Sequence, residues 1–270
     1  MYRELFTEPI SKILINHGFC SLRSVHNFLQ KNNVSVNKTR VLQSSEQADI
    51  SKDEICMNGK PLPKQKHVYI LMNKPCGYVC AKESGRHPVV YDLLSSINIE
   101  KNLGTLHTIG RLDSDTEGLL LLTTNGSFSH KLCAPDFNIQ KKYFVTLENS
   151  VSEEEQENYK IAFKSGITLP AEKKFGEQKV QPAKLQFLNE SDCVLTISEG
   201  KFHQVKRMFL AVNNKVLKLK RIQFGTIKLD KTLLPGEWRF LEQTELESLA
   251  DSYRQNIQWL SSSKLPDTAI

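Results

Sequence analysis

The sequence contains no apolar run close to the roughly 18 residues that a membrane-spanning helix needs. Its first residues, "MYRELFTEPISKIL", also lack the basic, apolar and small-residue order of a secretory signal peptide. We therefore expect a cytoplasmic protein with no membrane partner.

Glycine-rich phosphate loops are missing as well, because neither GxGxxG nor GxxxxGK[ST] occurs. This absence disfavours functions that depend on ATP or a dinucleotide. It also disfavours a base methyltransferase, which would need a glycine-rich loop to bind S-adenosylmethionine. No internal repeat or long low-complexity tract is visible.

The six cysteines show no repeated pairing. Cys76 and Cys80, in "CGYVC", are the only close pair, and no second pair or nearby histidines complete a ligand set for structural zinc. We expect reduced, partly buried thiols and no metal site.

Charge is present in mild excess and is clustered. The 270 residues include 36 lysines and arginines against 30 acids, for a net charge of +6. The segment from Ser198 to Arg221, "SEGKFHQVKRMFLAVNNKVLKLKR", carries a single acid, Glu199, among many basic residues. Clustered positive charge indicates an anionic partner.

The first sixty residues read as a small module. A short helix is expected to end at Gly18, a second to run from a cap at Ser21 to about Lys31, and "VSVN" to form a strand. "MNGKPL" offers an Asn-Gly turn. "KPLPKQK", residues 60–66, is typical of a linker because its prolines interrupt helices and central strands.

A larger domain is expected from His67 onward, opening with the apolar run of "HVYILMNKPCGYVC". Strands and helices alternate without a regular βαβ rhythm, so the pattern predicts an α+β fold with a largely antiparallel sheet. A terminal helix is expected over 242–259, followed by a frayed tail. The later predicted strands are 119–123, 143–147, 194–198 and 216–222.

The most unusual stretch is "IGRLDSDTEGLLLLTTNG", residues 109–126, where acids directly precede four leucines. Asp113, Asp115 and Glu117 have the spacing of a calcium loop, but that loop needs a glutamate at Thr124. A phosphatase nucleophile would follow a buried apolar strand, which "GTLHTIGR" is not. The remaining alternative is a solvated loop before a buried strand that an Asn-Gly turn closes.

Arg111 weakens that last alternative, because it can share a face with Asp113 and pair with an anion or insert into nucleic acid.

A basic helix supplies a partner for these acids. In "HQVKRMFLAV" the residues at 205, 208, 209 and 212 form one apolar face. His203 and Arg207 are then expected to point away from the core. Lys206 lies at the edge of the apolar stripe, where it can snorkel or hold a buried carboxylate ionised.

A strand, "QKKYFVTLE", places Tyr143 on one face and Lys142 on the other. Tyr143 is by default packing, although an aromatic face can also stack on a base.

Together these stretches resemble the pseudouridine synthases of the branch that modifies ribosomal RNA. "GRLDSDTEGLLLLTTNG" is similar to the catalytic motif of that branch, "QKKYFVTLE" to its tyrosine motif and "LTISEGKFHQVKRMF" to its basic motif. "YILMNKPCGYVC" and "LKRIQFGTIKLDKTLLPGEWRFL" extend the similarity over roughly residues 67–250. Within the branch, the fit is closest to the enzymes for a uridine in small-subunit (16S) rRNA, with the large-subunit (23S) enzymes as the nearest alternative.

The resemblance implies an architecture. Residues 1–66 would form an S4-like α/β RNA-binding domain and linker, although "EPISKIL" lacks the arginine with which that domain usually begins. Residues 67–250 would form the catalytic domain, with a mostly antiparallel mixed sheet and a central cleft. Residues 251–270 would form a C-terminal helix and tail.

It also implies roles. Asp113 would be the nucleophile, Tyr143 would stack on the uracil and assist proton removal at C5, and Lys206 would pair with Asp113. Arg111 would help to extrude the target nucleotide. Asp115 and Glu117 are interpreted as structural, and the family uses no metal and no organic cofactor.

The remaining RNA-binding candidates are Arg23, Lys142, His203 and Arg207, and we expect a monomer that binds 16S rRNA or a small-subunit assembly intermediate. The competing hypothesis is a non-catalytic RNA-binding protein of ribosome assembly, which would have no reason to keep Asp113, Tyr143 and Lys206 together.

Overall fold

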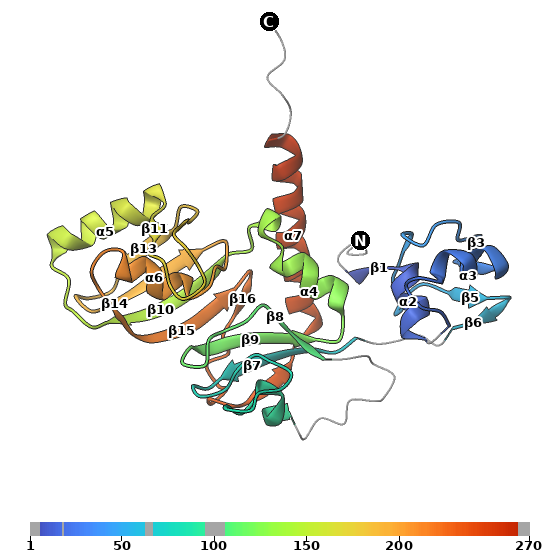
Figure 1. The fold of residues 1–270 in the computed structure, drawn as a ribbon, viewed down its shortest axis with the longest axis horizontal. Helices are drawn as coiled ribbons and strands as arrows, with labels where there is room; N and C mark the ends of the chain where they lie inside the picture. The colour runs from blue at the N-terminus through green and yellow to red at the C-terminus, as the bar shows by residue number, and fades with distance from the viewer. Residues whose placement is uncertain (1–5, 18, 63–66, 95–105, 264–270) are drawn as a thin grey trace, which may run out of the picture.

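The computed structural model describes residues 6–17, 19–62, 67–94 and 106–263 (Figure 1). The expected helix end at Gly18, most of the expected linker and the expected tail after residue 263 lie outside these ranges.

The N-terminal unit, residues 6–62, packs two helices on a small sheet of strand order β3-β2-β5-β6. Its own buried cluster includes Ile13, Leu14 and Val34. Its elements are β1 (Glu8–Pro9), α2 (Ile10–Asn16), α3 (Val25–Lys31), β2 (Val34–Val36), β3 (Thr39–Arg40), β4 (Gln47–Ala48), β5 (Ile55–Met57) and β6 (Lys60–Pro61).

Local signals in this unit were partly correct. The Asn-Gly turn is confirmed, because Asn58 and Gly59 have φ of 50° and 79° between the antiparallel strands β5 and β6. The expected cap at Ser21 is wrong: α3 begins at Val25, and Ser21 instead hydrogen-bonds Ser24 in the preceding turn. The expected linker also starts too early, since its first two residues form β6.

The large unit, residues 67–263, is built on one sheet of strand order β13-β14-β10-β15-β9-β7-β17, with β16 on β15 and β8 on β9. Its strands are β7 (Tyr69–Lys74), β8 (His107–Ile109), β9 (Glu117–Thr123), β10 (Lys141–Leu147), β13 (Lys184–Phe187), β14 (Asp192–Ile197), β15 (Val216–Phe224), β16 (Ile227–Lys228) and β17 (Trp238–Phe240).

Within the described residues, β15 and β9 pair in parallel, and the other ladders of this sheet are antiparallel. The predicted α+β class with a mostly antiparallel mixed sheet is therefore confirmed. Gly118 makes the parallel contact possible: a Cβ at this residue would lie 2.3 Å from the carbonyl oxygen of Arg221, and its φ is +101°.

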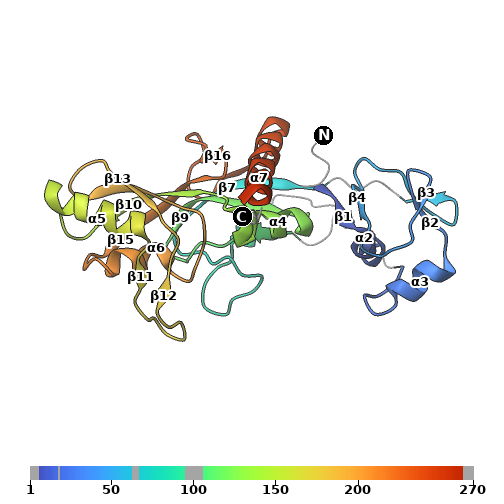
Figure 2. The same ribbon diagram turned by 90° about the horizontal axis from the view of Figure 1, so that it is seen from above.

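Helices cover both faces of the sheet, and they are α4 (Gly126–Cys133), α5 (Glu153–Ser165), α6 (Gln204–Leu210) and α7 (Gln243–Ser263). α5 and α6 lie at the β10–β13–β14 end, whereas α4 and α7 lie by β9 and β16 (Figures 1 and 2). None of the helices in the described ranges is long and apolar enough to cross a membrane.

The four consecutive leucines follow from this two-sided cover. Leu119 and Leu121 pack with α4 and α7, whereas Leu120 and Leu122 join the cluster on the other face. All four are completely buried, because β9 is a central strand with both faces covered.

Two expected boundaries change. Asn125 and Gly126 do not make a hairpin turn; Asn125 caps α4, its Oδ1 accepting a hydrogen bond from the Phe128 amide. The terminal helix runs on to Ser263, and residue 250 lies inside it. Leu249 and Tyr253, on either side of that expected boundary, pack in the same cluster.

The two units meet near the start of α4. Phe6 stacks on Phe128 with ring centroids 5.4 Å apart and contacts Tyr69 edge-on. Glu8 is buried beside His67, and its Oε1 accepts a hydrogen bond from Lys12. Both views place the N-terminal unit beside the α4 end of the sheet (Figures 1 and 2).

Candidate active site

Asp113 lies in the loop that joins β8 to β9, directly before the parallel contact with β15. A turn in which the Thr116 amide donates to the carbonyl oxygen of Asp113 shapes this loop. The Asp113 side chain is 35% exposed in the protein without RNA. The carboxylate that Lys206 was expected to hold is therefore partly exposed, and not buried, in the free protein.

A completely buried lysine holds the loop from beneath. Lys74, the last residue of β7, is 0% exposed, and its Nζ donates to the carbonyl oxygens of Asp113 and Thr116 at 3.0 and 2.9 Å. Further contacts reach the carbonyl oxygens of Pro75 and Ser114. Burial lowers the pKa of Lys74, although the nearby thiols and carboxylates oppose that shift.

The segment after β7 lies along the same loop. The Gly77 amide donates to the carbonyl oxygen of Ser114 at 2.7 Å, and the Leu112 amide contacts Cys80 Sγ at 3.4 Å. The described part of the chain holds all six cysteines, and each is a free thiol. The backbone around Asp113 is thus held by the end of β7 and by the segment that follows it.

Lys206, on α6, reaches the acidic loop from the other half of the sheet. Its Nζ lies 3.5 Å from Asp113 Oδ2 and 2.5 Å from Asp115 Oδ1. Sequence reasoning placed Lys206 against Asp113 and gave Asp115 a structural role; in the structure the lysine contacts both carboxylates. Burial raises the pKa of Asp115, but the hydrogen bond and charge of Lys206 lower it more, so the net shift is downward.

His203 also faces the nucleophile candidate. Its Nε2 lies 3.7 Å from Asp113 Oδ1, and its Nδ1 lies 2.8 Å from Glu172 Oε1. His203 precedes α6 with a left-handed backbone, φ 46° and ψ 31°. Sequence reasoning missed Glu172, for which the sequence carried no signal, and it missed Lys74 although the "NKP" segment containing it was part of the resemblance.

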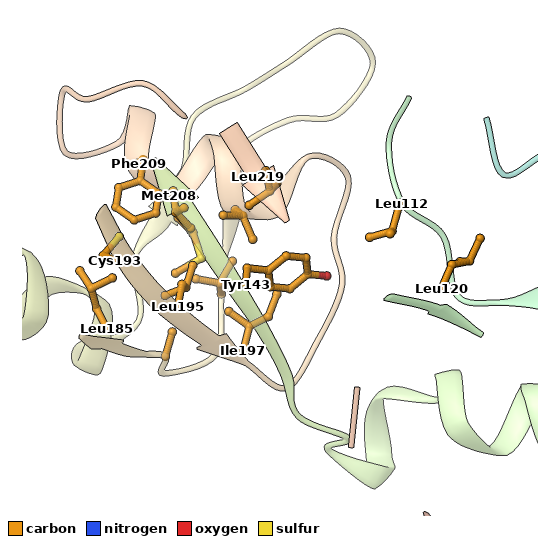
Figure 3. Close-up of a cluster of buried hydrophobic side chains, with 14 of the residues drawn as sticks. Leu112, Leu120, Tyr143, Leu185, Cys193, Leu195, Ile197, Met208, Phe209 and Leu219 are labelled. Carbon is orange, nitrogen blue, oxygen red and sulfur yellow. The ribbon is translucent and has the colours of Figure 1, made fainter. Parts of the chain in front are cut away.

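Tyr143 is 8% exposed on β10, directly opposite Arg221 of β15. Figure 3 shows its ring among the leucines of the cluster, with the hydroxyl directed toward Leu112, the neighbour of Asp113. The alternation of buried and partly exposed residues along β10 confirms the predicted strand faces. Tyr143 therefore lies on the same side of the sheet as the Asp113 loop.

Arg207 lies outside the apolar face of α6, as predicted, but it is buried there and not exposed. Arg207 is 1% exposed, and its guanidinium donates to the carbonyl oxygens of Pro170, Gly176 and Phe202 and to Gln178 Oε1. The apolar face of α6 is as expected, but a hairpin covers the opposite side of the helix. Arg207 therefore holds protein backbone in this structure and is not exposed to an RNA phosphate.

Three other RNA-binding candidates are at least partly exposed. Arg111 is exposed in the Asp113 loop, two residues from the carboxylate. Lys142 is partly exposed on β10, and Arg23 is exposed in the turn before α3 of the N-terminal unit.

One depression of the surface lies apart from the Asp113 cluster. This depression, of about 510 Å³, is formed by the loop from Lys82 to Val89 with Asp92, and none of the clustered site residues lines it.

Among the described residues, no group of three or more His, Cys, Asp and Glu side chains is arranged to hold a metal ion.

Comparison with known proteins identifies the family of this chain. Residues 68–211 match the family model described as RNA pseudouridylate synthase. The ribosomal small subunit pseudouridine synthase A of Haemophilus influenzae is 44% identical over 67% of this chain and 73% of its own length. The enzyme of the same name from Pasteurella multocida is 37% identical over 88% of this chain and 97% of its own length.

A crystal structure of a pseudouridylate synthase is similar with a TM-score of 0.61 and 36% identity, covering 89% of this chain and 99% of that chain. The family-model match over residues 68–211 includes both the Asp113 loop and α6, which the sequence motifs had linked. The chain belongs to the RNA pseudouridylate synthase family.

Proposed function

We propose that this protein converts one specific uridine of small-subunit (16S) ribosomal RNA to pseudouridine, with Asp113 as the nucleophile. The observation that carries the proposal is the Asp113 carboxylate facing Lys206 and His203, in a chain 37–44% identical to small-subunit synthases.

The reaction rearranges atoms without adding or removing any. The bond between N1 and C1′ breaks, a bond between C5 and C1′ forms, and the proton lost from C5 is balanced by one gained at N1. A nucleophile must hold the reacting fragment while the base turns. One carboxylate suffices for this role, and we expect neither a metal nor an organic cofactor.

Lys206 keeps Asp113 ionised as the bound base displaces water around it, because a nearby positive charge favours the carboxylate. Tyr143 stacks on the uracil and assists removal of the C5 proton. Tyr143 shares a buried cluster with Leu112, the neighbour of Asp113, and its hydroxyl is directed toward that side, which supports this role.

The target base must leave its stack, at a cost of a few kcal/mol. Arg111, exposed beside Asp113, is suited to occupy the position that the base leaves. We assign phosphate contacts to Lys142 and, in the S4-like unit, to Arg23, so that binding weakens steeply with salt. The protein acts as a monomer in the cytoplasm, on rRNA or a small-subunit assembly intermediate.

The test maps pseudouridines by carbodiimide treatment and primer extension across 16S and 23S rRNA from a deletion strain. We expect one site in 16S rRNA to be missing, and to return with the wild-type gene but not with Asp113→Asn. Identical maps with and without the gene would overturn the proposed activity, and a missing site in 23S rRNA would overturn the proposed substrate.

A further inference from the structure

Each oxygen of the Asp113 carboxylate faces a different group. Lys206 Nζ lies 3.5 Å from Oδ2, and His203 Nε2 lies 3.7 Å from Oδ1. The shortest contact of Lys206 is with Asp115, at 2.5 Å, so the lysine divides its charge between two acids. His203 is thus placed to fix the orientation of the Asp113 carboxylate, which Lys206 alone holds loosely.

The second ring nitrogen of His203 is fixed from the opposite side. Glu172 Oε1 lies 2.8 Å from Nδ1, and the imidazole stacks on Phe202 with ring centroids 3.8 Å apart. A carboxylate only accepts hydrogen bonds, so Glu172 accepts from Nδ1–H and sets the plane of the ring, and Nε2 must carry a proton as well for His203 to donate to Asp113. An imidazole oriented by a carboxylate on its far nitrogen is a recurring arrangement in catalytic sites.

Glu172 belongs to a hairpin that α6 holds firmly. The hairpin joins β11 (Thr168–Leu169) to β12 (Gln178–Lys179), and Glu172 and Phe175 exchange two backbone hydrogen bonds of 2.8 and 2.9 Å across its turn. Phe175 stacks on Phe202, the ring that supports His203.

Arg207 fixes the base of this hairpin. Its guanidinium donates to the carbonyl oxygen of Pro170 on one arm, and to that of Gly176 and to Gln178 Oε1 on the other. A completely buried charge is tolerated here because these acceptors satisfy it.

The backbone at His203 supports a functional reading of these contacts. A left-handed conformation is unfavourable for a residue with a Cβ, and such residues persist where the surrounding structure holds them. Here that conformation begins α6 and places the imidazole between the two carboxylates.

We propose that the β11–β12 hairpin positions the nucleophile: Glu172 orients His203, and His203 together with Lys206 orients the Asp113 carboxylate. This inference rests on the proposed function for its catalytic consequence. Glu172 and His203 are positioning residues, and the hairpin contributes to the rate of the reaction rather than to the affinity for RNA.

The test compares Glu172→Ala, Glu172→Gln and a matched control, Glu177→Ala. Glu177 is exposed on the same hairpin, so its substitution makes the same change in charge without touching His203. We expect Glu172→Ala to lower the single-turnover rate at saturating 16S rRNA about 10-fold with RNA affinity changed less than about twofold. Glu172→Gln keeps an acceptor for Nδ1 and should restore most of the rate, and Glu177→Ala should behave as wild type.

A double-mutant cycle sharpens this result. Since Glu172 acts through His203, adding Glu172→Ala to His203→Ala should lower the rate no further, whereas independent roles would multiply the two effects. Equal rates for Glu172→Ala and Glu177→Ala would overturn the proposal. So would a Glu172→Ala variant with weaker RNA binding and an unchanged rate.

A measurement on the free protein separates this proposal from the proposed function. We expect the Nδ1 proton of His203 to be visible by NMR in wild type and in Glu177→Ala, and to exchange rapidly in Glu172→Ala. Its absence in wild type would overturn the hairpin arrangement. A wild-type protein that shows the proton but modifies no rRNA would instead overturn the proposed function.

Discussion

The two halves of the large sheet meet at the parallel pair β15–β9, and each half fixes one side of the site with a buried cation. In the β7–β9 half, Lys74 donates to the carbonyl oxygens of the Asp113 loop. In the β10–β14 half, Arg207 donates to the carbonyl oxygens of the β11–β12 hairpin. Both cations are within 1% of complete burial and hold backbone.

Lys206 differs from both. Its side chain is 24% exposed, and its contacts are with two carboxylates. Depth of burial and type of acceptor therefore distinguish the cations that shape this site from the cation assigned to its chemistry.

Replacing Lys206 should produce the largest effect. Lys206→Met leaves Asp113 and Asp115 close together without their shared cation, so we expect turnover to fall about 10²-fold or more with little change in the free energy of unfolding. Lys206→Arg keeps the charge and should lose less than about 10-fold. Single-turnover kinetics and urea unfolding check both variants. A large loss of stability in Lys206→Met would contradict the distinction between Lys206, assigned to the chemistry, and Lys74, which holds backbone.

Replacing Lys74 should act mainly on stability. Lys74→Met leaves the buried carbonyl oxygens of Asp113 and Thr116 without their donor, and we expect the free energy of unfolding to fall by roughly 3 kcal/mol. Lys164→Met makes the same change at an exposed position of α5 and should cost less than about 0.5 kcal/mol. Urea unfolding measures both, and equal values would contradict the role of Lys74 as a clamp.

Lys141 tests what a partly buried cation costs when its acceptor is poor. Its Nζ contacts the carbonyl oxygen of Ser198 at 3.4 Å, and burial, aided by the charge of Arg221, lowers its pKa to about 8. Between pH 8 and the ordinary pKa of lysine, the unfolded chain keeps this proton and the folded protein has released it, so stability rises with pH.

The expected gain for wild type over that window is on the order of 2 kcal/mol, and Lys141→Met should lack it. Urea unfolding at pH 7.5 and pH 10 measures the difference between the two proteins. The same pH dependence in both would show that Lys141 is not the titrating group.

Replacing Asn125, which is neutral, should lower the free energy of unfolding less than replacing Lys74 does. This loss is a reference for the losses expected from the lysines. Asn125 is completely buried; its Oδ1 accepts from the Phe128 amide at 3.0 Å and its Nδ2 contacts the Tyr69 hydroxyl. Asn125→Ala should lower the free energy of unfolding by about 1 kcal/mol, measured by urea unfolding. Asn125→Asp keeps the acceptor, and an equal loss in both variants would contradict the capping role.

The fold class and the main strands of the large unit could be predicted from the sequence. An alternating apolar pattern indicates a strand with one buried face, and a continuous apolar run indicates a strand buried on both faces. Leu119–Thr123 and Tyr143–Leu147 lie inside β9 and β10. Ends and turns were less predictable. Asn125 and Gly126 read as a hairpin signal, but the next segment packs on the sheet as a helix that Asn125 caps.

The candidate site was predictable where it rested on motifs and unpredictable where it rested on packing between distant segments. The approach of Lys206 to Asp113 was expected from the family resemblance. Arg207 was not: periodicity correctly placed it outside the apolar stripe of α6, but it cannot show that another hairpin covers that side. Glu172 reaches His203 only through the same hairpin.

We propose that the Asp113 carboxylate carries out the isomerisation, and release of the C5 hydrogen reports that reaction directly. 16S rRNA labelled with tritium at C5 of uridine is incubated with wild-type protein and with Asp113→Asn, and RNA binding is measured in parallel. We expect wild type to release about one equivalent of tritium per rRNA, and Asp113→Asn to release none although it binds RNA as wild type does. Equal release from both proteins would contradict it.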